Sequence, residues 1–304
     1  MESHRLPRFR RVANIALIQL TARDREIIRR VHQHRFLRSS HLATLIGGSR
    51  QQLLRRLQLL YHHGCLERSR AQIDYYHRGG SRCLAYGLGN QGKALLKHED
   101  QHFESGTKNA AVGRLFLEHA LMVSDVMVAL ELACRRNGHV RLLTGSELVF
   151  ADATEIPREP FQWNVTLANR TKLGAIPDRV FALEFPDHPK DRNRVLCFLE
   201  ADRGTMPVER RGLAKSSFLR KLLAYEATWQ QGLHRKQFGF PRFRVVTVTT
   251  SPARVDSLVA VCGQLSRGHG LFLFTDLATL LAHPDLFLLP FQSGRAGQIT
   301  TLLD

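Results

Sequence analysis

The segment from Gly47 to Leu66 constrains the fold of this chain more than any other. Two glycines precede Ser49, a residue type that caps helices, and Gln52 stands three residues after it, as in a capping box. Apolar side chains follow at helical spacing and predict one buried face: Leu53, Leu54, Leu57, Leu60 and Tyr61. We therefore expect a helix over residues 49–63 that starts from a tight glycine turn.

Two shorter helices are predicted before this segment. Thr21, with Asp24 three residues later, is close to a capping box and starts the first helix. A break at residues 35–38 follows, and Ser39 or Ser40 then caps the second helix. Three short helices with a glycine turn before the third are typical of a helix-turn-helix.

A hairpin is predicted after the third helix. Two strand-like segments, residues 65–74 and 82–88, are separated by a pair of glycines that favours a hairpin tip. Arg78 and Arg82 flank this tip, where a guanidinium group can contact backbone phosphate. Three helices followed by a hairpin predict a winged helix-turn-helix domain over residues 1–98.

The outer face of the third helix carries arginine and glutamine but no acid. The predicted contact residues are Arg50, Gln51, Arg55, Arg56, Gln58 and His62. Arginine can pair with guanine and glutamine with adenine in the major groove. A solvated polar face is the alternative, because both residue types also favour helices. A merely solvated helix usually mixes charge signs, so the pattern favours contact with double-stranded DNA.

The charge of the chain also indicates a polyanionic partner. The 304 residues have a net charge of +17, and residues 1–100 hold 19 Lys and Arg against 7 Asp and Glu. Such a balance is typical of proteins that bind nucleic acid or an anionic membrane. No apolar run approaches the roughly 18 residues of a membrane span. We expect a cytoplasmic DNA-binding protein without membrane contact, and a homodimer, since helix-turn-helix proteins often read palindromes.

The five cysteines predict core positions rather than a metal site. No two of them form a CxxC pair, so a zinc site is not expected. Cys134, Cys197 and Cys262 stand in apolar surroundings and are predicted to be buried.

Residues 113–304 predict a second domain of the α/β type, after a polar linker over residues 99–112. A long amphipathic helix over residues 114–136 comes first. Strands are then predicted over residues 140–143 with 148–150, 176–185, 195–201, 243–250 and 271–274, and helices over residues 216–233, 254–265 and 277–282. Residues 243–250 are rich in valine and predict a central strand that is buried on both faces. The fold class is therefore α+β, with a mixed sheet flanked by helices in the second domain.

Acidic residues near strand ends form the candidate site of this domain. Asp178 follows a proline, and Glu200 and Asp202 have one residue between them, so both can point to the same side of a strand. Lys221 and Tyr225 share one face of the next helix. Converging carboxylates can hold Mg²⁺, and a nearby lysine can then orient or deprotonate a water molecule.

A purely structural role is the alternative for these acids. In that interpretation Asp202 pairs with Arg203 and Glu200 only ends a strand. A covalent, topoisomerase-like route through Tyr225 is a third interpretation, supported by its lysine neighbour alone.

Several stretches of the chain resemble the replication-relaxation family of bacterial plasmid and mobile-element proteins. They are residues 21–27, 34–37, 55–57, 61–66, 117–121, 124–126, 177–178 and 198–205, with Lys221 and Tyr225 after them. Together they extend over nearly the whole chain in the expected order. The resemblance implies a winged-helix DNA-binding domain that acts in plasmid replication, DNA relaxation or element control, with other plasmid or mobile-element proteins as partners.

The second domain also resembles the PD-(D/E)XK nuclease fold. On that resemblance Asp178 and Glu200 match the two metal-holding acids, and Glu118 matches an additional acid on a helix. The usual lysine two residues after the second acid is Asp202 here, and Lys221 stands where some members place it instead. The resemblance implies a Mg²⁺-dependent endonuclease or nickase as the alternative to a regulator. Its catalytic residues would be Asp178, Glu200 and Lys221, and its metal ligands Glu118, Asp178, Glu200 and Asp202.

Overall fold

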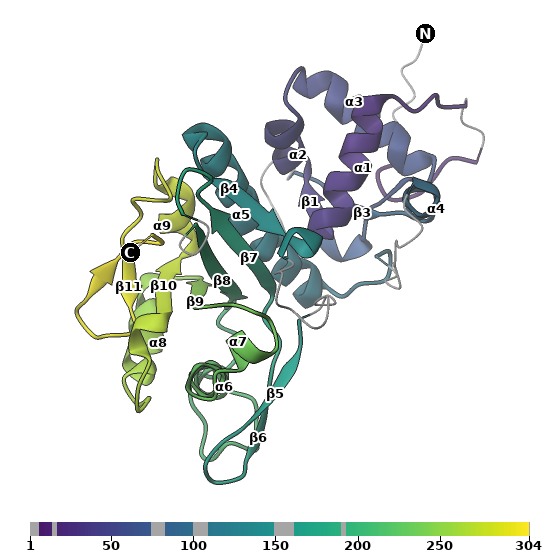
Figure 1. Ribbon diagram of the computed structural model, residues 1–304. Coiled ribbons are helices and arrows are strands. Elements are labelled where there is room, and N and C mark those ends of the chain that lie inside the picture. Colours follow the sequence, from purple (N-terminus) through teal and green to yellow (C-terminus); the bar gives the residue numbers. More distant parts are fainter. Residues whose placement is uncertain are drawn as a thin grey trace. The chain divides into compact units, whose positions relative to one another are not determined.

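The computed structural model describes residues 6–13, 17–73, 83–99, 109–148, 161–189 and 193–303. The chain forms two compact units, Met1–Val128 and Ala129–Asp304 (Figure 1). The boundary between them lies inside the helix α5 (Arg114–Asn137), which agrees closely with the predicted long helix. Of the predicted linker, residues 100–108 lie outside the described residues.

The first unit begins with the helices α1 (Ala22–His34), α2 (Ser39–Ile46) and α3 (Arg50–His62). The predicted capping box of α1 is confirmed: the Thr21 hydroxyl accepts a hydrogen bond from the Asp24 backbone N–H, and Asp24 Oδ2 accepts one from the Thr21 N–H at 2.8 Å. The predicted serine cap of α2 is wrong. Arg38 is the cap and Ser39 already lies in the helix, because the residues before it belong to a strand.

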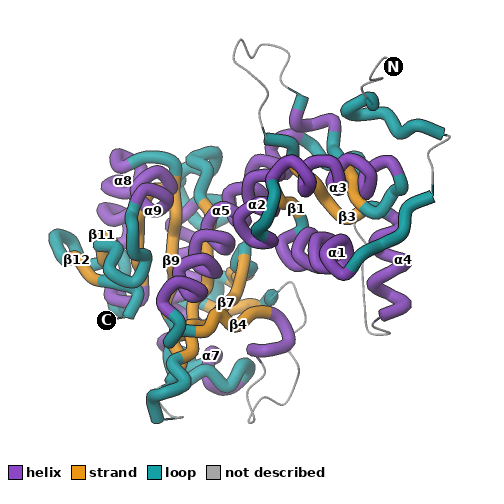
Figure 2. The backbone as a smooth tube through the Cα atoms, turned by 90° about the horizontal axis from the view of Figure 1, so that it is seen from above, coloured by secondary structure: helices purple, strands orange, loops and turns teal. Residues whose placement is uncertain are grey.

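A small antiparallel sheet completes the first unit, together with the helix α4 (Asn90–Glu99) and the short turn η1 (Arg70–Gln72). Its strands are β1 (Phe36–Arg38), β2 (Leu66–Glu67) and β3 (Ala85–Leu88), in the order β1-β3-β2. Figure 2 shows α1 and α2 next to β1 and β3. The sequence predicted only a break where β1 lies. The predicted hairpin tip, with Arg78 and Arg82, lies outside the described residues.

The second unit is built on a mixed sheet of seven strands. They are β4 (Arg141–Thr144), β7 (Arg179–Glu184), β8 (Arg194–Ala201), β9 (Arg244–Thr249), β10 (Phe272–Asp276), β11 (Phe291–Ser293) and β12 (Ile299–Thr300). Their order is β12-β11-β10-β9-β8-β7-β4, in which β9 is parallel to both neighbours and the other pairs are antiparallel. The prediction of a buried central strand at β9 is confirmed.

Helices α6 and α8 pack on one face of this sheet. The helical segments of the unit after β8 are α6 (Phe218–Gln230), α7 (Leu233–Lys236), α8 (Pro252–Cys262), η3 (His269–Leu271) and α9 (Leu277–Ala282). Phe198 of β8 lies in one core cluster with Leu222 of α6 and Leu258 of α8. Since side chains two apart share a strand face, Glu200 is directed to the same side. No helix in the described part of the chain is long and apolar enough to cross a membrane.

An additional hairpin packs against α6. Its strands are β5 (Trp163–Thr166) and β6 (Lys172–Ala175), and Trp163 Nε1 donates a hydrogen bond to Thr228 Oγ1 at 2.7 Å. This hairpin was not predicted. A strand was predicted at residues 148–150 instead, where the structure has the end of the short turn η2 (Gly145–Leu148) and where residues 149–150 are outside the described ones.

The cysteines predicted to be core residues are buried. This holds for Cys134, Cys197 and Cys262, and none of the three forms a disulfide. Burial in an apolar environment raises the pKa of the Cys197 and Cys262 thiols to about 12, because it disfavours the thiolate. These thiols act as small apolar side chains in the core.

Candidate nucleic-acid interface and carboxylate site

The outer face of α3 presents arginine and glutamine to solvent. Ser49 fixes the start of the helix, since its Oγ accepts a hydrogen bond from the Gln52 N–H at 3.4 Å. Leu53, Leu57 and Leu60 are fully buried beneath it, as predicted. The outward side chains are Arg50, Gln51 and Arg55, which are exposed, and Gln58, which is half-buried. Leu54 was predicted to be buried but is 40% exposed, so the face is less polar than expected.

Arg50 and Arg55 carry the uncompensated charge of this face. Neither guanidinium group forms a hydrogen bond or ion pair with another residue in the described ranges. No acid occurs between Ser49 and Leu66. A rigid helix therefore displays two free five-donor groups, which suit bidentate contacts to guanine or phosphate.

Arg56 was predicted to contact DNA, but it is engaged inside the first unit. Its Nε donates to Asp24 Oδ1 at 2.9 Å, its Nη2 to Asp24 Oδ2, and the same nitrogen to the Gln19 carbonyl at 3.1 Å. Asp24 has no exposed surface. Although burial alone would raise the pKa of Asp24, hydrogen bonds from Arg56 and Thr21 lower it. Arg56 thus ties α3 to the start of α1.

His62 is also not available on the outer face. It is only 4% exposed, and its Nδ1 accepts a hydrogen bond from the Val12 N–H at 3.3 Å. Arg11, the residue before Val12, donates a hydrogen bond to the Tyr61 carbonyl at 2.9 Å. Burial, with the nearby charges of Arg68 and Arg11, lowers the pKa of His62 and keeps the ring neutral. The prediction that His62 is exposed on the outer face is wrong, because Arg11 and Val12 contact the end of α3.

Glu200 is the centre of the candidate site in the second unit. It lies in β8 and is 2% exposed. Its Oε1 accepts a hydrogen bond from Tyr225 Oη at 2.5 Å, and its Oε2 forms an ion pair with Lys221 Nζ. The two partners stand four residues apart on α6, as the sequence predicted.

Asp178 joins Glu200 and Lys221 at the end of β8. Its Oδ2 accepts a hydrogen bond from the Ala201 N–H at 2.8 Å, and its own N–H donates to the Leu199 carbonyl at 3.0 Å. These bonds hold the aspartate beside Glu200. The structure therefore brings together the three residues that the sequence analysis selected as catalytic candidates.

The electrostatics of this group differ from those of ordinary surface residues. Burial raises the pKa of Glu200, and the charge of Asp178 adds to this while Lys221 opposes it. Burial would lower the pKa of Lys221, but the charges of Glu200 and Asp178 outweigh it and raise that pKa. Burial and the Glu200 charge raise the pKa of Tyr225 well above its ordinary value. Tyr225 is fully buried and protonated, which does not favour the covalent route.

Asp202 is directed to a different set of partners. Its Oδ2 accepts hydrogen bonds from Thr249 Oγ1 at 2.9 Å and Arg254 Nε at 2.8 Å, and its Oδ1 accepts one from the Gly204 N–H at 3.2 Å. Arg254 also donates to the Met206 carbonyl at 2.6 Å. The sequence offered Arg203 as the partner of Asp202; it gave no sign of Arg254, 52 residues further along the chain.

Glu118 lies on the part of α5 that belongs to the first unit. Its carboxylate accepts a hydrogen bond from Arg114 Nε at 2.8 Å, one helical turn earlier, and its side chain is 38% exposed. Asp178 and Glu200 belong to the second unit. Glu118 therefore does not belong to the cluster that Asp178, Glu200 and Lys221 form within the second unit.

The donor set of the site fits a magnesium ion that also uses substrate oxygens. No group of three or more His, Cys, Asp or Glu side chains is placed to hold a metal among the described residues. Mg²⁺ commonly takes only one or two carboxylates and completes its shell with water and phosphate oxygens. Asp178 and Glu200 supply two such carboxylates, and Lys221, with 31% of its side chain exposed, contacts Glu200.

Comparison with known proteins assigns the chain to a family. The family model for replication-relaxation proteins matches residues 28–242, which include α3, Asp178, Glu200 and Lys221. Among curated proteins and solved structures, none is significantly similar to this chain. The match extends over well more than half of the 304 residues and agrees with the resemblance seen in the sequence. This protein therefore belongs to the replication-relaxation family.

Proposed function

We propose that this protein binds double-stranded DNA of a plasmid or mobile element through α3 and acts as a replication or regulatory factor. The observation that carries the proposal is the outer face of α3, where Arg50 and Arg55 are exposed, unpaired among the described residues and free of neighbouring acids. Membership in the replication-relaxation family supports a role connected with plasmid replication.

The order of elements in the first unit supports a winged helix-turn-helix. The described residues run α1-β1-α2-α3-β2-η1-β3, and the three strands pair in the order β1-β3-β2. In helix-turn-helix proteins the second helix of the motif enters the major groove and its side chains contact base edges. By this assignment α2 and α3 form the motif, and α3 is the recognition helix.

Arg55→Ala is expected to weaken binding to the preferred duplex by about 1–3 kcal/mol and to relax base preference at one position, because one bidentate contact is lost. The measurement is a titration of a duplex selected by the protein from a random pool, at several salt concentrations. The slope of log K against log salt is expected to fall slightly, as one phosphate or base contact disappears.

Lys97→Ala is the matched control for this titration. Lys97 is exposed on α4 of the same unit, and the change removes the same single charge. Affinity and base preference are expected to stay at the wild-type level in this control. If Arg55→Ala bound the selected duplex as tightly and as selectively as the wild type, α3 would not be the recognition helix.

A metal-dependent nuclease is the second candidate function, and the convergence of Asp178, Glu200 and Lys221 favours it. Apart from the short turn η2, the β5–β6 hairpin and the short helix α7, the elements from α5 onwards follow the order α5-β4-β7-β8-α6-β9, with the acids just before β7 and at the end of β8. This is what the PD-(D/E)XK resemblance leads one to expect. The lysine of that motif is supplied here by α6 rather than by β8.

The residues of this group have separable tasks in such a reaction. Asp178 and Glu200 would hold Mg²⁺, which as a Lewis acid would polarise a phosphodiester and stabilise its developing charge. Lys221 forms an ion pair with Glu200 and can orient a water molecule or neutralise a phosphate oxygen. Tyr225 fixes the Glu200 carboxylate by its hydrogen bond.

Asp178→Ala is expected to abolish the nicking of supercoiled plasmid in the presence of Mg²⁺ or Mn²⁺, because one of the two carboxylates is removed. The assay follows conversion to the relaxed circle on a gel. Asp187→Ala is the matched control, since Asp187 lies in the turn between β7 and β8 with 78% of its side chain exposed. An absence of nicking by the wild type with both metals, with DNA binding intact, would leave the regulator as the function of the chain.

A further inference from the structure

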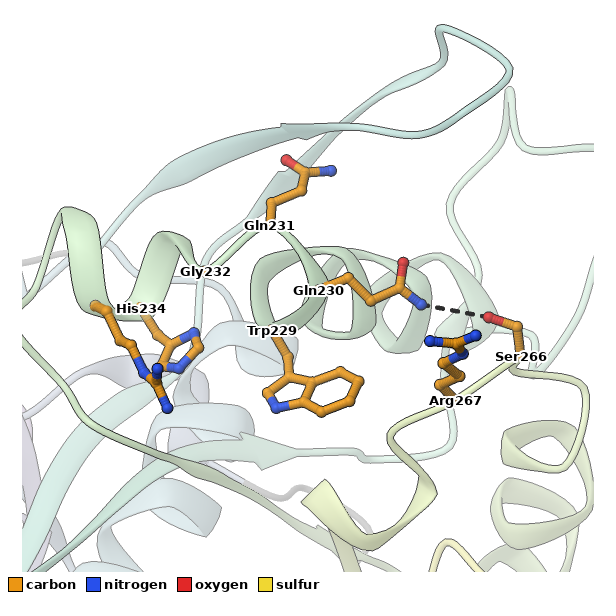
Figure 3. A pocket seen from close by; sticks show the side chains of 8 residues that line it. Trp229, Gln230, Gln231, Gly232, His234, Ser266 and Arg267 are labelled. Carbon is orange, nitrogen blue, oxygen red and sulfur yellow. Dashed lines mark hydrogen bonds between the residues drawn. The ribbon is translucent and has the colours of Figure 1, made fainter.

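A cavity of about 670 Å³ lies at the end of α6, and none of its lining residues belongs to the cluster of Asp178, Glu200 and Lys221. It is lined by Trp229, Gln230, Gln231, Gly232, His234, Arg235, Ser266 and Arg267. Figure 3 shows the Trp229 indole between His234 and Arg267, with the Gln230 amide hydrogen-bonded to Ser266. The volume is within the range of sites that hold small molecules or single nucleotides.

Trp229 gives this cavity an exposed aromatic surface. It is 39% exposed and is the one aromatic residue among the large apolar side chains that are exposed in the described part of the chain. The other tryptophan of the protein, Trp163, is 4% exposed and satisfied by its hydrogen bond to Thr228. An indole left open to water beside polar side chains is the arrangement on which a planar ligand can stack.

The wall opposite α6 is held in place by a buried acid. Glu226 is 6% exposed, and its Oε1 accepts hydrogen bonds from Ser266 Oγ and the Arg267 N–H, both at 2.8 Å. Gln230 Nε2 donates to the same oxygen at 3.2 Å and to Ser266 Oγ at 3.3 Å. The loop after α8 is therefore fixed to α6, and the cavity is formed before any ligand arrives.

The charge of the cavity is positive. Arg235 and Arg267 line it, and no acid is among its lining residues in the described ranges. Arg235 uses its Nε on the Pro241 carbonyl at 3.1 Å, which leaves its other N–H groups available. The Glu226 carboxylate is directed into the loop after α8. An anionic group is therefore favoured at the rim of the cavity.

We propose that this cavity binds an unpaired nucleotide of single-stranded DNA, with the base stacked on Trp229 and the adjoining phosphates held by Arg235 and Arg267. Gln230 and Gln231 line the same cavity. Their amide nitrogens donate to Ser266 and to the Thr166 carbonyl, and their amide oxygens can accept hydrogen bonds from the edge of the base. A duplex does not satisfy this site, because the faces of its bases are covered by their neighbours. Stacking on an aromatic ring combined with a basic rim is the usual way in which proteins hold a single strand.

The position of the cavity on α6 adds a consequence for the neighbouring site. Lys221 and Trp229 are eight residues apart on this helix, which corresponds to about 12 Å along its axis. A strand anchored at Trp229 is thus within a few nucleotides of the carboxylate group. The single-strand site does not depend on duplex binding by α3, nor on cleavage.

The test uses the full-length protein and a fluorescently labelled oligothymidylate. Binding is expected to quench tryptophan emission in the wild type and to raise the anisotropy of the label. Trp229→Ala is expected to weaken binding about 5- to 150-fold, because one base–aromatic stack is lost. Trp229→Phe keeps a ring and is expected to retain most of the affinity while losing the quenching. Arg267→Ala is expected to weaken binding and to reduce its salt dependence.

Two variants separate this site from other contributions. Arg211→Ala removes an exposed arginine outside the cavity and is expected to bind as the wild type does. Arg55→Ala, which impairs duplex binding if α3 is the recognition helix, is expected to keep its affinity for the single strand. An equal loss in Arg211→Ala and Arg267→Ala would show unspecific charge attraction and overturn the proposal.

Two competitors identify the ligand. Thymidine monophosphate is expected to compete weakly with the oligonucleotide. Inorganic polyphosphate is expected to compete through the arginines alone and therefore not to quench the emission of Trp229. If the monophosphate bound as tightly as the oligonucleotide, the cavity would be a mononucleotide site and the proposal would fail. It would fail equally if the oligonucleotide neither quenched Trp229 nor lost affinity in Trp229→Ala.

Discussion

Replacing Arg56 by alanine is expected to lower the free energy of unfolding by about 3 kcal/mol, the lower end of the range for breaking a buried ion pair. Asp24 is fully buried, and without Arg56 its carboxylate would keep only its bonds to Thr21. The guanidinium group itself is partly exposed, which limits the loss. Urea unfolding at neutral pH, followed by far-ultraviolet circular dichroism, measures the effect.

Arg55→Ala serves as the control for this loss as well. It makes the same substitution one position earlier, at an exposed side chain, and is expected to change the stability by less than about 0.5 kcal/mol. The double variant Asp24→Asn/Arg56→Ala is expected to recover part of the loss, because no unpaired charge remains in the core. Equal stabilities of the Arg55 and Arg56 variants would contradict a structural role for Arg56.

The same ion pair predicts a pH dependence. Burial favours the neutral form of Asp24, but the hydrogen bonds of Arg56 and Thr21 outweigh it, so the pKa in the folded state lies below the ordinary value. The stability that this group contributes is therefore present above about pH 4 and is lost as the pH falls through the lowered pKa. The difference in the free energy of unfolding between wild type and Arg56→Ala is expected to have its full size at pH 7 and to become smaller below about pH 4. A difference that grew on acidification would contradict the assignment.

Replacing Asp202 by alanine is the second substitution with a large expected effect, a loss of about 3–5 kcal/mol in the free energy of unfolding. Its side chain is 4% exposed and joins the end of β8 to Thr249 of β9 and Arg254 of α8. Removal leaves the Arg254 guanidinium, 16% exposed, without its carboxylate. Asp202→Asn keeps one oxygen for these donors and is expected to lose less.

Added Mg²⁺ distinguishes this structural role from metal binding. If Asp202 acts through Arg254, the difference in unfolding midpoint between wild type and Asp202→Ala is expected to be the same with and without Mg²⁺. A difference that appears only with the ion would assign Asp202 to the metal instead. Asp187→Ala, which removes an exposed acid of the same unit, is expected to leave the midpoint unchanged.

Local signals in the sequence were sufficient for the longer elements. The Thr21–Asp24 pattern, the leucine spacing of α3 and the valine-rich β9 each depend on neighbours within a few residues. Several of the shortest strands escaped prediction, among them β1, β5 and β6. β1, for example, exists because Phe36–Arg38 pairs with residues 85–87, and three residues are too few for an alternating pattern.

The candidate sites divide in the same way. The spacing of Lys221 and Tyr225 placed them on one face of α6, where both contact Glu200. The strand period placed Glu200 and Asp202 on one side of a strand. Arg56 and Asp202 were misjudged or left open because their partners are 32 and 52 residues away. The local sequence does not distinguish a helical arginine that contacts DNA from one that pairs with a buried aspartate.

The reactivity of the buried thiols of the second unit measures how often the core of this unit opens. Only the thiolate reacts with disulfide reagents, so Cys197 and Cys262, with pKa values raised to about 12, stay silent while the core is closed. Labelling can then proceed only through molecules whose sheet has opened transiently. Cys197 lies in β8, the strand of Glu200, and Cys262 ends α8, the helix of Arg254. The rate at which these two sulfurs are modified therefore reports directly on how often the framework around the carboxylates comes apart.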